Sequence, residues 1–101
     1  MEYHKLVRDK IPKIIAQNGG CAHIRQLSQE EYIAALETKL DEEVGEYHRD
    51  HNIEELADIL EVVFSLSAAI GSREALMEAY QKKHNSRGGF ENRIFLISTE
   101  D

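Results

Sequence analysis

Two pairs of carboxylates are the residues of this chain whose type and spacing best suit chemistry. Glu43 and Glu46 lie three positions apart in the run DEEVGE, and Glu55 and Asp58 lie three positions apart in EELAD. Residues at this spacing share one face of a helix. If the two helices pack antiparallel, the four carboxylates converge and repel one another unless a cation binds them. An all-oxygen site of this kind suits Mg²⁺, so the pattern predicts a metal-dependent enzyme acting on phosphates.

Two further acidic residues are candidates for proton transfer. Either Glu42 or Glu61 could accept a proton from an attacking water molecule. The competing interpretation of all these residues is a solvated acidic face with helix caps. Glu55 in particular would be favourable in a first helical turn without binding anything, because of the helix dipole.

Basic residues crowd towards the two ends of the chain, whereas the middle is acidic. Arginine can bind phosphate through two parallel hydrogen bonds, and lysine can act as a point charge. Ordinary surface salt bridges are the competing explanation for each residue alone. The candidate phosphate contacts are Arg8, Lys10, Lys39, Lys83, Arg87 and Arg93, of which Arg8, Lys10 and Arg87 rank highest.

The first acidic pair belongs to a helix with a clear start. Ser28 and Glu31 form the sequence pattern of a capping box. The apolar positions that follow are Ile33, Leu36, Leu40, position 43 and Tyr47. Position 43 is a glutamate, and a carboxylate in such a seam is unfavourable unless it is paired or coordinated. A conflict of this kind tends to mark a functional site.

The second acidic pair opens a helix that follows Asn52, a favourable N-cap. Only eight residues separate Glu46 from Glu55, which requires a tight turn through residues 48–52. Residues 56–70 are apolar on nearly all sides, which predicts burial on all sides. A single chain of this length has difficulty surrounding one helix, so we expect a second copy to cover part of it.

The remaining elements complete an all-α fold. A helix is expected over residues 8–18, starting nearer Asp9 because Pro12 must lie in its first turn. Residues 21–27 are expected to be extended or loop, and another helix runs from the N-cap Ser72 to about Asn85. We expect one four-helix bundle-like domain over residues 1–101, completed by oligomerisation. The C-terminal run FENRIFLI is expected to be a short extended tail that supplies one strand of a small hairpin.

Composition limits the function classes. The formal net charge of −7 argues against binding a nucleic acid polymer, which requires a basic face. No apolar run reaches the roughly 18 residues that span a membrane. The single cysteine, Cys21, allows no intramolecular disulfide and suggests a reduced, semi-buried thiol in a cytoplasmic protein.

The acidic motifs also resemble those of a known superfamily. The pattern Glu42-Glu43-x-x-Glu46 followed by Glu55-x-x-Asp58 is similar to the EExxE…ExxD signature of the all-α nucleoside triphosphate pyrophosphohydrolases. This superfamily includes MazG, dimeric dUTPases and phosphoribosyl-ATP pyrophosphohydrolase. The end segments KLVRDKIP (residues 5–12) and RGGFENRIFL (residues 87–96) look like those of a small branch of bacteria and phages that is MazG-like or phosphoribosyl-ATP pyrophosphohydrolase-like.

The resemblance implies specific roles. It implies that Glu43, Glu46, Glu55 and Asp58 bind Mg²⁺, for which Mn²⁺ could substitute. It also implies cleavage between the α- and β-phosphates to give a nucleoside monophosphate and pyrophosphate, in a bundle built from two or more chains. House-cleaning of non-standard nucleotides is the preferred hypothesis. The alternatives are a phosphoribosyl-ATP pyrophosphohydrolase of histidine synthesis and a non-catalytic helical module that binds a nucleotide or a protein.

Overall fold

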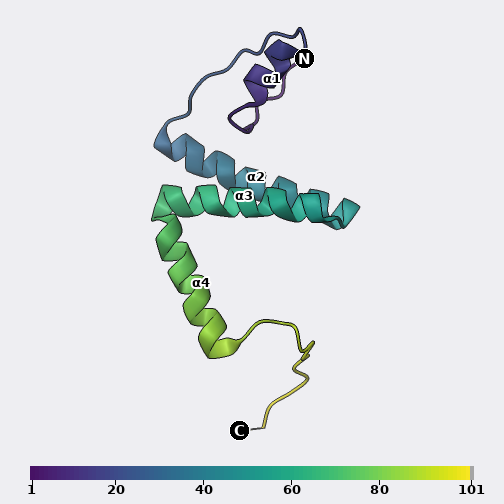
Figure 1. Ribbon diagram of the computed structural model, residues 1–101, viewed down its shortest axis with the longest axis vertical. Helices are drawn as coiled ribbons and strands as arrows, with labels where there is room; N and C mark the ends of the chain where they lie inside the picture. Colours follow the sequence, from purple (N-terminus) through teal and green to yellow (C-terminus); the bar gives the residue numbers. More distant parts are fainter. Residues whose placement is uncertain (101) are drawn as a thin grey trace.

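The computed structural model describes residues 1–100 and is all-α over that range (Figure 1). Its four helices are α1 (Ile11–Gln17), α2 (Gln29–Asp50), α3 (Ile53–Ile70) and α4 (Arg73–Arg87). The expected all-α class is therefore confirmed for the described residues. Within the same range, no helix has both the length and the apolar character needed to cross a membrane.

An antiparallel hairpin of α2 and α3 forms the centre of the molecule (Figure 1). The predicted capping box is present at the start of α2, where the Ser28 hydroxyl accepts from the Glu31 N–H and the Glu31 carboxylate accepts from the Ser28 N–H. Asn52 caps α3 by accepting from the N–H of Glu55 at 3.1 Å. Only His51 and Asn52 separate the two helices, which confirms the predicted tight turn.

The two ends of the hairpin are fixed by different contacts. At the open end, the Gln29 side-chain amide donates to the Ala69 carbonyl at 3.1 Å. At the turn, His51 adopts a left-handed conformation and its N–H bonds to the Tyr47 carbonyl. This geometry reverses the chain within two residues and brings the last turns of α2 against the first turns of α3.

Helix α1 is shorter than expected. The sequence predicted a helix over residues 8–18, but α1 begins at Ile11 and ends at Gln17. The prediction was wrong at its N-terminal end because Pro12 is confined to the first turn and Lys10 supplies no side-chain cap. Residues 1–10 therefore form an irregular segment that runs over the hairpin.

Helix α4 leaves the end of α3 and projects away from the hairpin (Figure 1). Ser72 caps it as predicted, by accepting from the Ala75 N–H. The Arg73 guanidinium lies 3.8 Å from the centre of the Phe64 ring and braces the corner. The tail beyond Arg87 is irregular. Residues 88–100 contain no strand, so the expected hairpin strand is not present. The reason is that no other segment of the described chain pairs with this tail.

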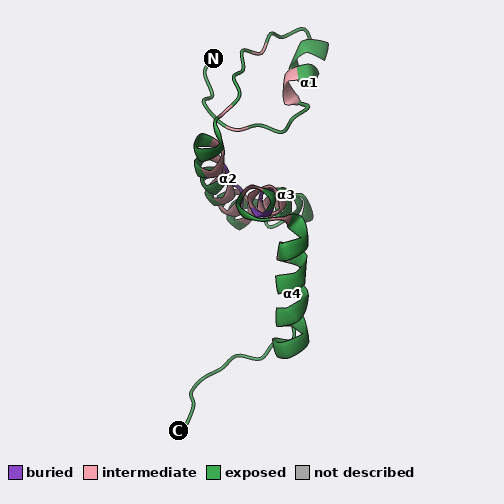
Figure 2. Cartoon of the chain, turned by 90° about the vertical axis from the view of Figure 1, so that its left-hand side faces the viewer, coloured by how far each residue is buried: buried purple, intermediate pink, exposed green. Residues whose placement is uncertain are grey.

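The core is small and lies where α2 meets α3 (Figure 2). Leu36 and Val62 are its buried apolar residues, whereas Leu56 and Leu60 on α3 are 43% and 50% exposed. The radius of gyration is 18.1 Å, compared with about 13 Å for a compact domain of 100 residues. One chain thus does not close a bundle. Cys21 is exposed, which corrects the expected semi-buried thiol, because the loop that carries it is not covered.

Candidate metal centre

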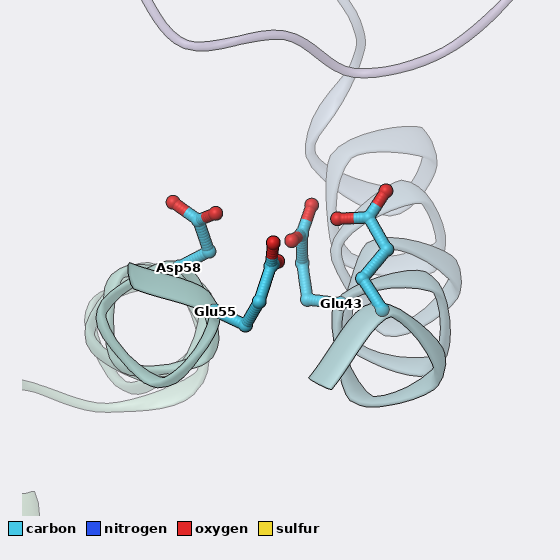
Figure 3. A group of neighbouring side chains, drawn as sticks. Glu43, Glu55 and Asp58 are labelled. Carbon is cyan, nitrogen blue, oxygen red and sulfur yellow. The ribbon is translucent and has the colours of Figure 1, made fainter. Parts of the chain in front are cut away.

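The short turn between α2 and α3 brings the two acidic pairs face to face. Glu43 and Glu46 lie one helical turn apart near the end of α2, and Glu55 and Asp58 lie one turn apart near the start of α3. One carboxylate oxygen from each residue lies within 4.8 Å of those from the other three. The labelled side chains in Figure 3 point from the two helices towards a common space. The four residues named from the sequence therefore form one cluster.

Glu43 is the most deeply placed member. Its residue is 6% exposed, in a molecule whose only buried apolar residues within the described range are Leu36 and Val62. Burial raises the pKa of Glu43, and the neighbouring Glu46 carboxylate raises it further, while Lys39 opposes both effects. The fold thus buries a glutamate among the apolar positions of α2, as the sequence predicted.

Glu55, on α3, is affected by burial and by neighbouring carboxylates in the same way as Glu43. Burial raises its pKa, and the negative charges of Glu46, Asp50, Asp58 and Glu43 add to the shift. Its backbone N–H is bonded to the Asn52 cap, and its carboxylate projects into the cluster (Figure 3). Both pKa values are therefore raised first by burial and second by neighbouring negative charge.

Two oxygen atoms of the cluster lack the partners that a bound cation would supply. Glu43 Oε2 and Glu55 Oε2 are both buried and have no hydrogen-bond partner. Buried carboxylate oxygens are normally paired, because an unsatisfied one retains its full desolvation cost. A hard divalent cation would satisfy both atoms, and the donor set contains only carboxylate oxygen, as Mg²⁺ prefers. The residues therefore fit such an ion.

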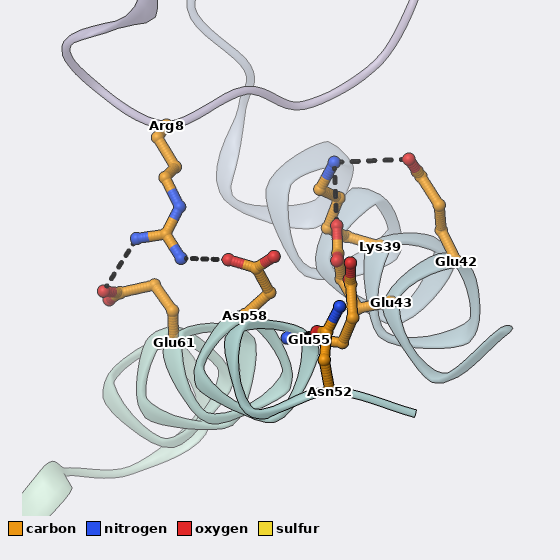
Figure 4. Close-up of polar contacts among 8 residues, drawn as sticks. All are labelled: Arg8, Lys39, Glu42, Glu43, Asn52, Glu55, Asp58 and Glu61. Atoms are coloured by element: carbon orange, nitrogen blue, oxygen red, sulfur yellow. Dashed lines mark hydrogen bonds and ion pairs between the residues drawn. The ribbon is translucent and has the colours of Figure 1, made fainter. Parts of the chain in front are cut away.

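Two basic side chains border the cluster on opposite sides (Figure 4). Lys39 Nζ lies 3.3 Å from Glu43 Oε1 and 3.4 Å from Glu42 Oε1. Arg8 donates from Nη2 to Asp58 Oδ1 at 2.7 Å and from Nη1 to Glu61 Oε1 at 3.2 Å. The hydrogen bond to Asp58 is the main cause of a raised Arg8 pKa. These two predicted phosphate contacts are thus engaged with carboxylates.

The two candidate proton acceptors differ in position. Glu42 lies 3.4 Å from Lys39 Nζ and 3.8 Å from Lys5 Nζ, with Lys39 between it and Glu43 (Figure 4). Glu61 lies one turn beyond Asp58 on α3 and lines the same cleft as Glu43 and Asp58. In this arrangement Glu61 is therefore better placed than Glu42 to meet a molecule bound at the cluster.

A cleft of about 410 Å³ adjoins the carboxylates. The N-terminal segment and α1 form one wall, and α2 and α3 form the others. Its apolar lining includes Ile14, Leu36 and Val62, while Tyr32 and Ser65 add polar groups. The volume lies within the range of about 300–1,000 Å³ that is typical of small-molecule sites. Glu43 and Asp58 line the cleft, so it and the carboxylate cluster are continuous.

The other predicted phosphate contacts are divided between two regions. Lys10 lines the cleft. Lys83 and Arg87 lie on α4, and Arg93 lies in the tail beyond it. Because α4 starts at the end of α3 opposite to the cluster (Figure 1), one chain does not bring these three residues to the carboxylates.

Sequence reasoning missed two features of the site. The pairing of Lys39 with Glu43 follows from their i, i+4 spacing, a signal that was available. The involvement of Tyr32 and Ser65 in the cleft had no such signal, because it depends on how an irregular N-terminal segment crosses the hairpin.

No family model matches the chain, and no solved structure matches it. A protein of Mycolicibacterium smegmatis (strain ATCC 700084 / mc(2)155), described as uncharacterized, is 57% identical over 42 residues. The match covers 42% of this chain and 43% of the relative. The chain thus matches less than half of that relative's length.

Proposed function

We propose that this chain is a Mg²⁺-dependent nucleoside triphosphate pyrophosphohydrolase. The observation that carries the proposal is the cluster of Glu43, Glu46, Glu55 and Asp58, with one nearly buried member and two unpartnered buried oxygens. The reaction adds water to the α-phosphorus and breaks its bond to the oxygen that bridges to the β-phosphate. The products are a nucleoside monophosphate and pyrophosphate.

The four carboxylates would hold Mg²⁺, or Mn²⁺ in its place. When bound, the ion would polarise a phosphoryl oxygen and make a coordinated water more acidic. The positively charged side chains that line the cleft, Arg8, Lys10 and Lys39, would contact the phosphates. The apolar side chains that line the cleft would contact the nucleoside.

Glu61 is our candidate for accepting the proton of the attacking water. It lines the cleft beside Asp58 but is not one of the four clustered carboxylates. Glu42 is the alternative, although its two lysine partners favour a structural role. A general base must be within hydrogen-bond reach of the water in the bound complex.

We also propose that the active form is a homo-oligomer in the cytoplasm. The exposed apolar residues of α3 and the open shape of one chain support a second copy. That copy would cover α3 and could supply Lys83, Arg87 and Arg93 to the neighbouring site.

Pyrophosphate release from a panel of nucleotides tests the activity. The panel should contain standard, deoxy and modified nucleoside triphosphates together with phosphoribosyl-ATP, each with Mg²⁺ or Mn²⁺. Asp58→Asn should lower kcat/KM by at least about 100-fold, since a cation in such a site is worth several kcal/mol. Asp41→Asn is the matched control, because Asp41 is exposed on α2 and outside the cluster.

The outcomes separate the candidate functions. Preference for phosphoribosyl-ATP would favour the role in histidine synthesis. Nucleotide binding without pyrophosphate release, in a folded protein, would favour the non-catalytic module.

A further inference from the structure

Arg8 is the side chain that ties the irregular N-terminal segment to α3. Its two terminal nitrogens bind carboxylates 50 and 53 positions away, at 2.7 Å on Asp58 and 3.2 Å on Glu61 (Figure 4). Lys5 makes the other ion pair between this segment and the hairpin, at 3.8 Å on Glu42 of α2. The position of the segment over α3 therefore depends on the negative charge of Asp58 and Glu61.

Asp58 has two prospective partners. It is one of the four clustered carboxylates, and its Oδ1 already accepts a hydrogen bond from Arg8. A cation bound to the cluster would withdraw the negative charge that holds the guanidinium and would repel it directly. The Arg8 and Asp58 side chains are 53% and 38% exposed, so water can replace the lost contact.

Lys39 provides a contrast on the opposite side of the cluster. It lies four residues before Glu43 on the same helix and is 20% exposed, so α2 holds it near the cluster whatever binds there. Arg8 is carried by a segment without regular structure, so no helix fixes its backbone beside the cluster. The guanidinium also lines the cleft beside Lys10, where its planar fork could bind phosphate through two hydrogen bonds.

We propose that Arg8 exchanges partners during the working cycle: it binds Asp58 and Glu61 in the metal-free protein, and a divalent cation releases it to bind the substrate's phosphates. This role rests on the proposed function and adds to it a competition between the arginine and the cation for one carboxylate. Removing Arg8 should therefore strengthen cation binding and weaken phosphate binding. A purely structural arginine would weaken both.

The first test is a Mn²⁺ titration followed by electron paramagnetic resonance, with wild type, Arg8→Ala and Lys13→Ala. Lys13 is the matched control because it removes the same charge from a nearby exposed position that does not line the cleft. Arg8→Ala should bind Mn²⁺ about two- to fivefold more tightly, the range for a partly exposed ion pair. Lys13→Ala should match wild type at 0.15 M salt, where distant charges are screened.

The second test uses inorganic tripolyphosphate in excess Mg²⁺, followed by calorimetry on the same proteins. Arg8→Ala should bind it at least threefold more weakly than wild type and Lys13→Ala. Thermal unfolding of each variant shows that the comparison is made on folded protein.

Several outcomes would overturn the exchange. Equal or weaker Mn²⁺ binding by Arg8→Ala would do so, as would an equal gain in both variants or unchanged tripolyphosphate binding. If one of these results is found while Mn²⁺ still binds the protein, the exchange is wrong but the proposed metal centre stands. Absence of Mn²⁺ binding in every protein would overturn both the exchange and the proposed metal-dependent function.

Discussion

Glu43 is the residue where stability and ligand binding are most directly linked. One of its oxygens pairs with Lys39 at 3.3 Å, and the other is buried without a partner beside three more carboxylates. Burying a charge is costly unless it is paired and fully hydrogen-bonded. In the metal-free chain Glu43 therefore opposes folding, and a bound cation would reverse that effect.

Glu43→Gln should make the metal-free protein more stable and abolish turnover. Removal of the negative charge relieves repulsion from Glu46 and Glu55, and we expect a gain of about 1 kcal/mol, which raises Tm by roughly 4–8 °C. Thermal unfolding in EDTA measures it. Glu37→Gln is the control, because Glu37 is exposed on the same helix. Loss of folding in Glu43→Gln would instead make Glu43 a structural carboxylate.

The raised pKa values of Glu43 and Glu55 predict how stability varies with pH. Between the ordinary value of 4.5 and the raised values, the folded chain holds more protons than the unfolded chain. By linkage, the free energy of unfolding of the metal-free protein falls as pH rises through this window. Urea unfolding from pH 4.5 to 7.5 should show the fall in EDTA and a smaller one with Mg²⁺.

Glu31 does not interfere with this measurement. Its hydrogen bond from Arg25 is the main reason that its pKa is lowered to about 2. The contribution of Glu31 to stability is therefore present above pH 4.5 and is lost only as pH falls towards 2.

The free energy of unfolding should thus depend on pH differently in EDTA and in Mg²⁺. The same pH dependence in both would contradict the assignment of the cluster as a cation site.

At the scale of elements, the α2–α3 hairpin was predictable because its signals are local. Ser28, Asn52 and Ser72 each cap a helix as expected, and helical spacing brings the acidic pairs together. The start of α1 is also set locally, by Pro12 and the uncapped Lys10. The cleft was not predictable, because it depends on the path of residues 1–10, which Arg8 ties to residues at least 50 positions away.

Gly45 offers a test of how α2 is covered. It lies within the helix, its φ is not positive, and a Cβ added there would meet nothing within 4 Å. Gly45→Ala should therefore stabilise the chain by about 0.5–1 kcal/mol. Ala34→Gly, at an exposed position of the same helix, should cost a similar amount. Loss of stability in Gly45→Ala, measured by urea unfolding, would indicate that another chain packs closely against this site.

At the scale of the whole molecule, one chain leaves much apolar surface uncovered. Leu56 and Leu60 lie four residues apart on α3 and are 43% and 50% exposed, and Met77 and Tyr80 on α4 are also exposed. The all-round apolar sequence of α3 predicted burial, but burial within one chain is limited to its contact with α2 and the corner with α4. The sequence could not reveal how a second copy would supply the rest.

We expect the wild-type protein to sediment as a dimer or larger species. The double variant Leu56→Ser/Leu60→Ser should shift it towards monomer at the same micromolar concentration, because it removes apolar area from the proposed interface. Ile97→Ser is the control, since Ile97 is 90% exposed in the tail. A wild-type monomer in sedimentation velocity would contradict the oligomeric proposal.

The central claim is that four carboxylates from two helices hold a divalent cation. Anomalous diffraction from crystals grown with Mn²⁺ tests it most directly. We expect a Mn²⁺ peak about 2.1 Å from carboxylate oxygens of the cluster, with the ligands drawn from Glu43, Glu46, Glu55 and Asp58. A cluster without a peak, while Mn²⁺ binds elsewhere on the protein, would contradict the claim.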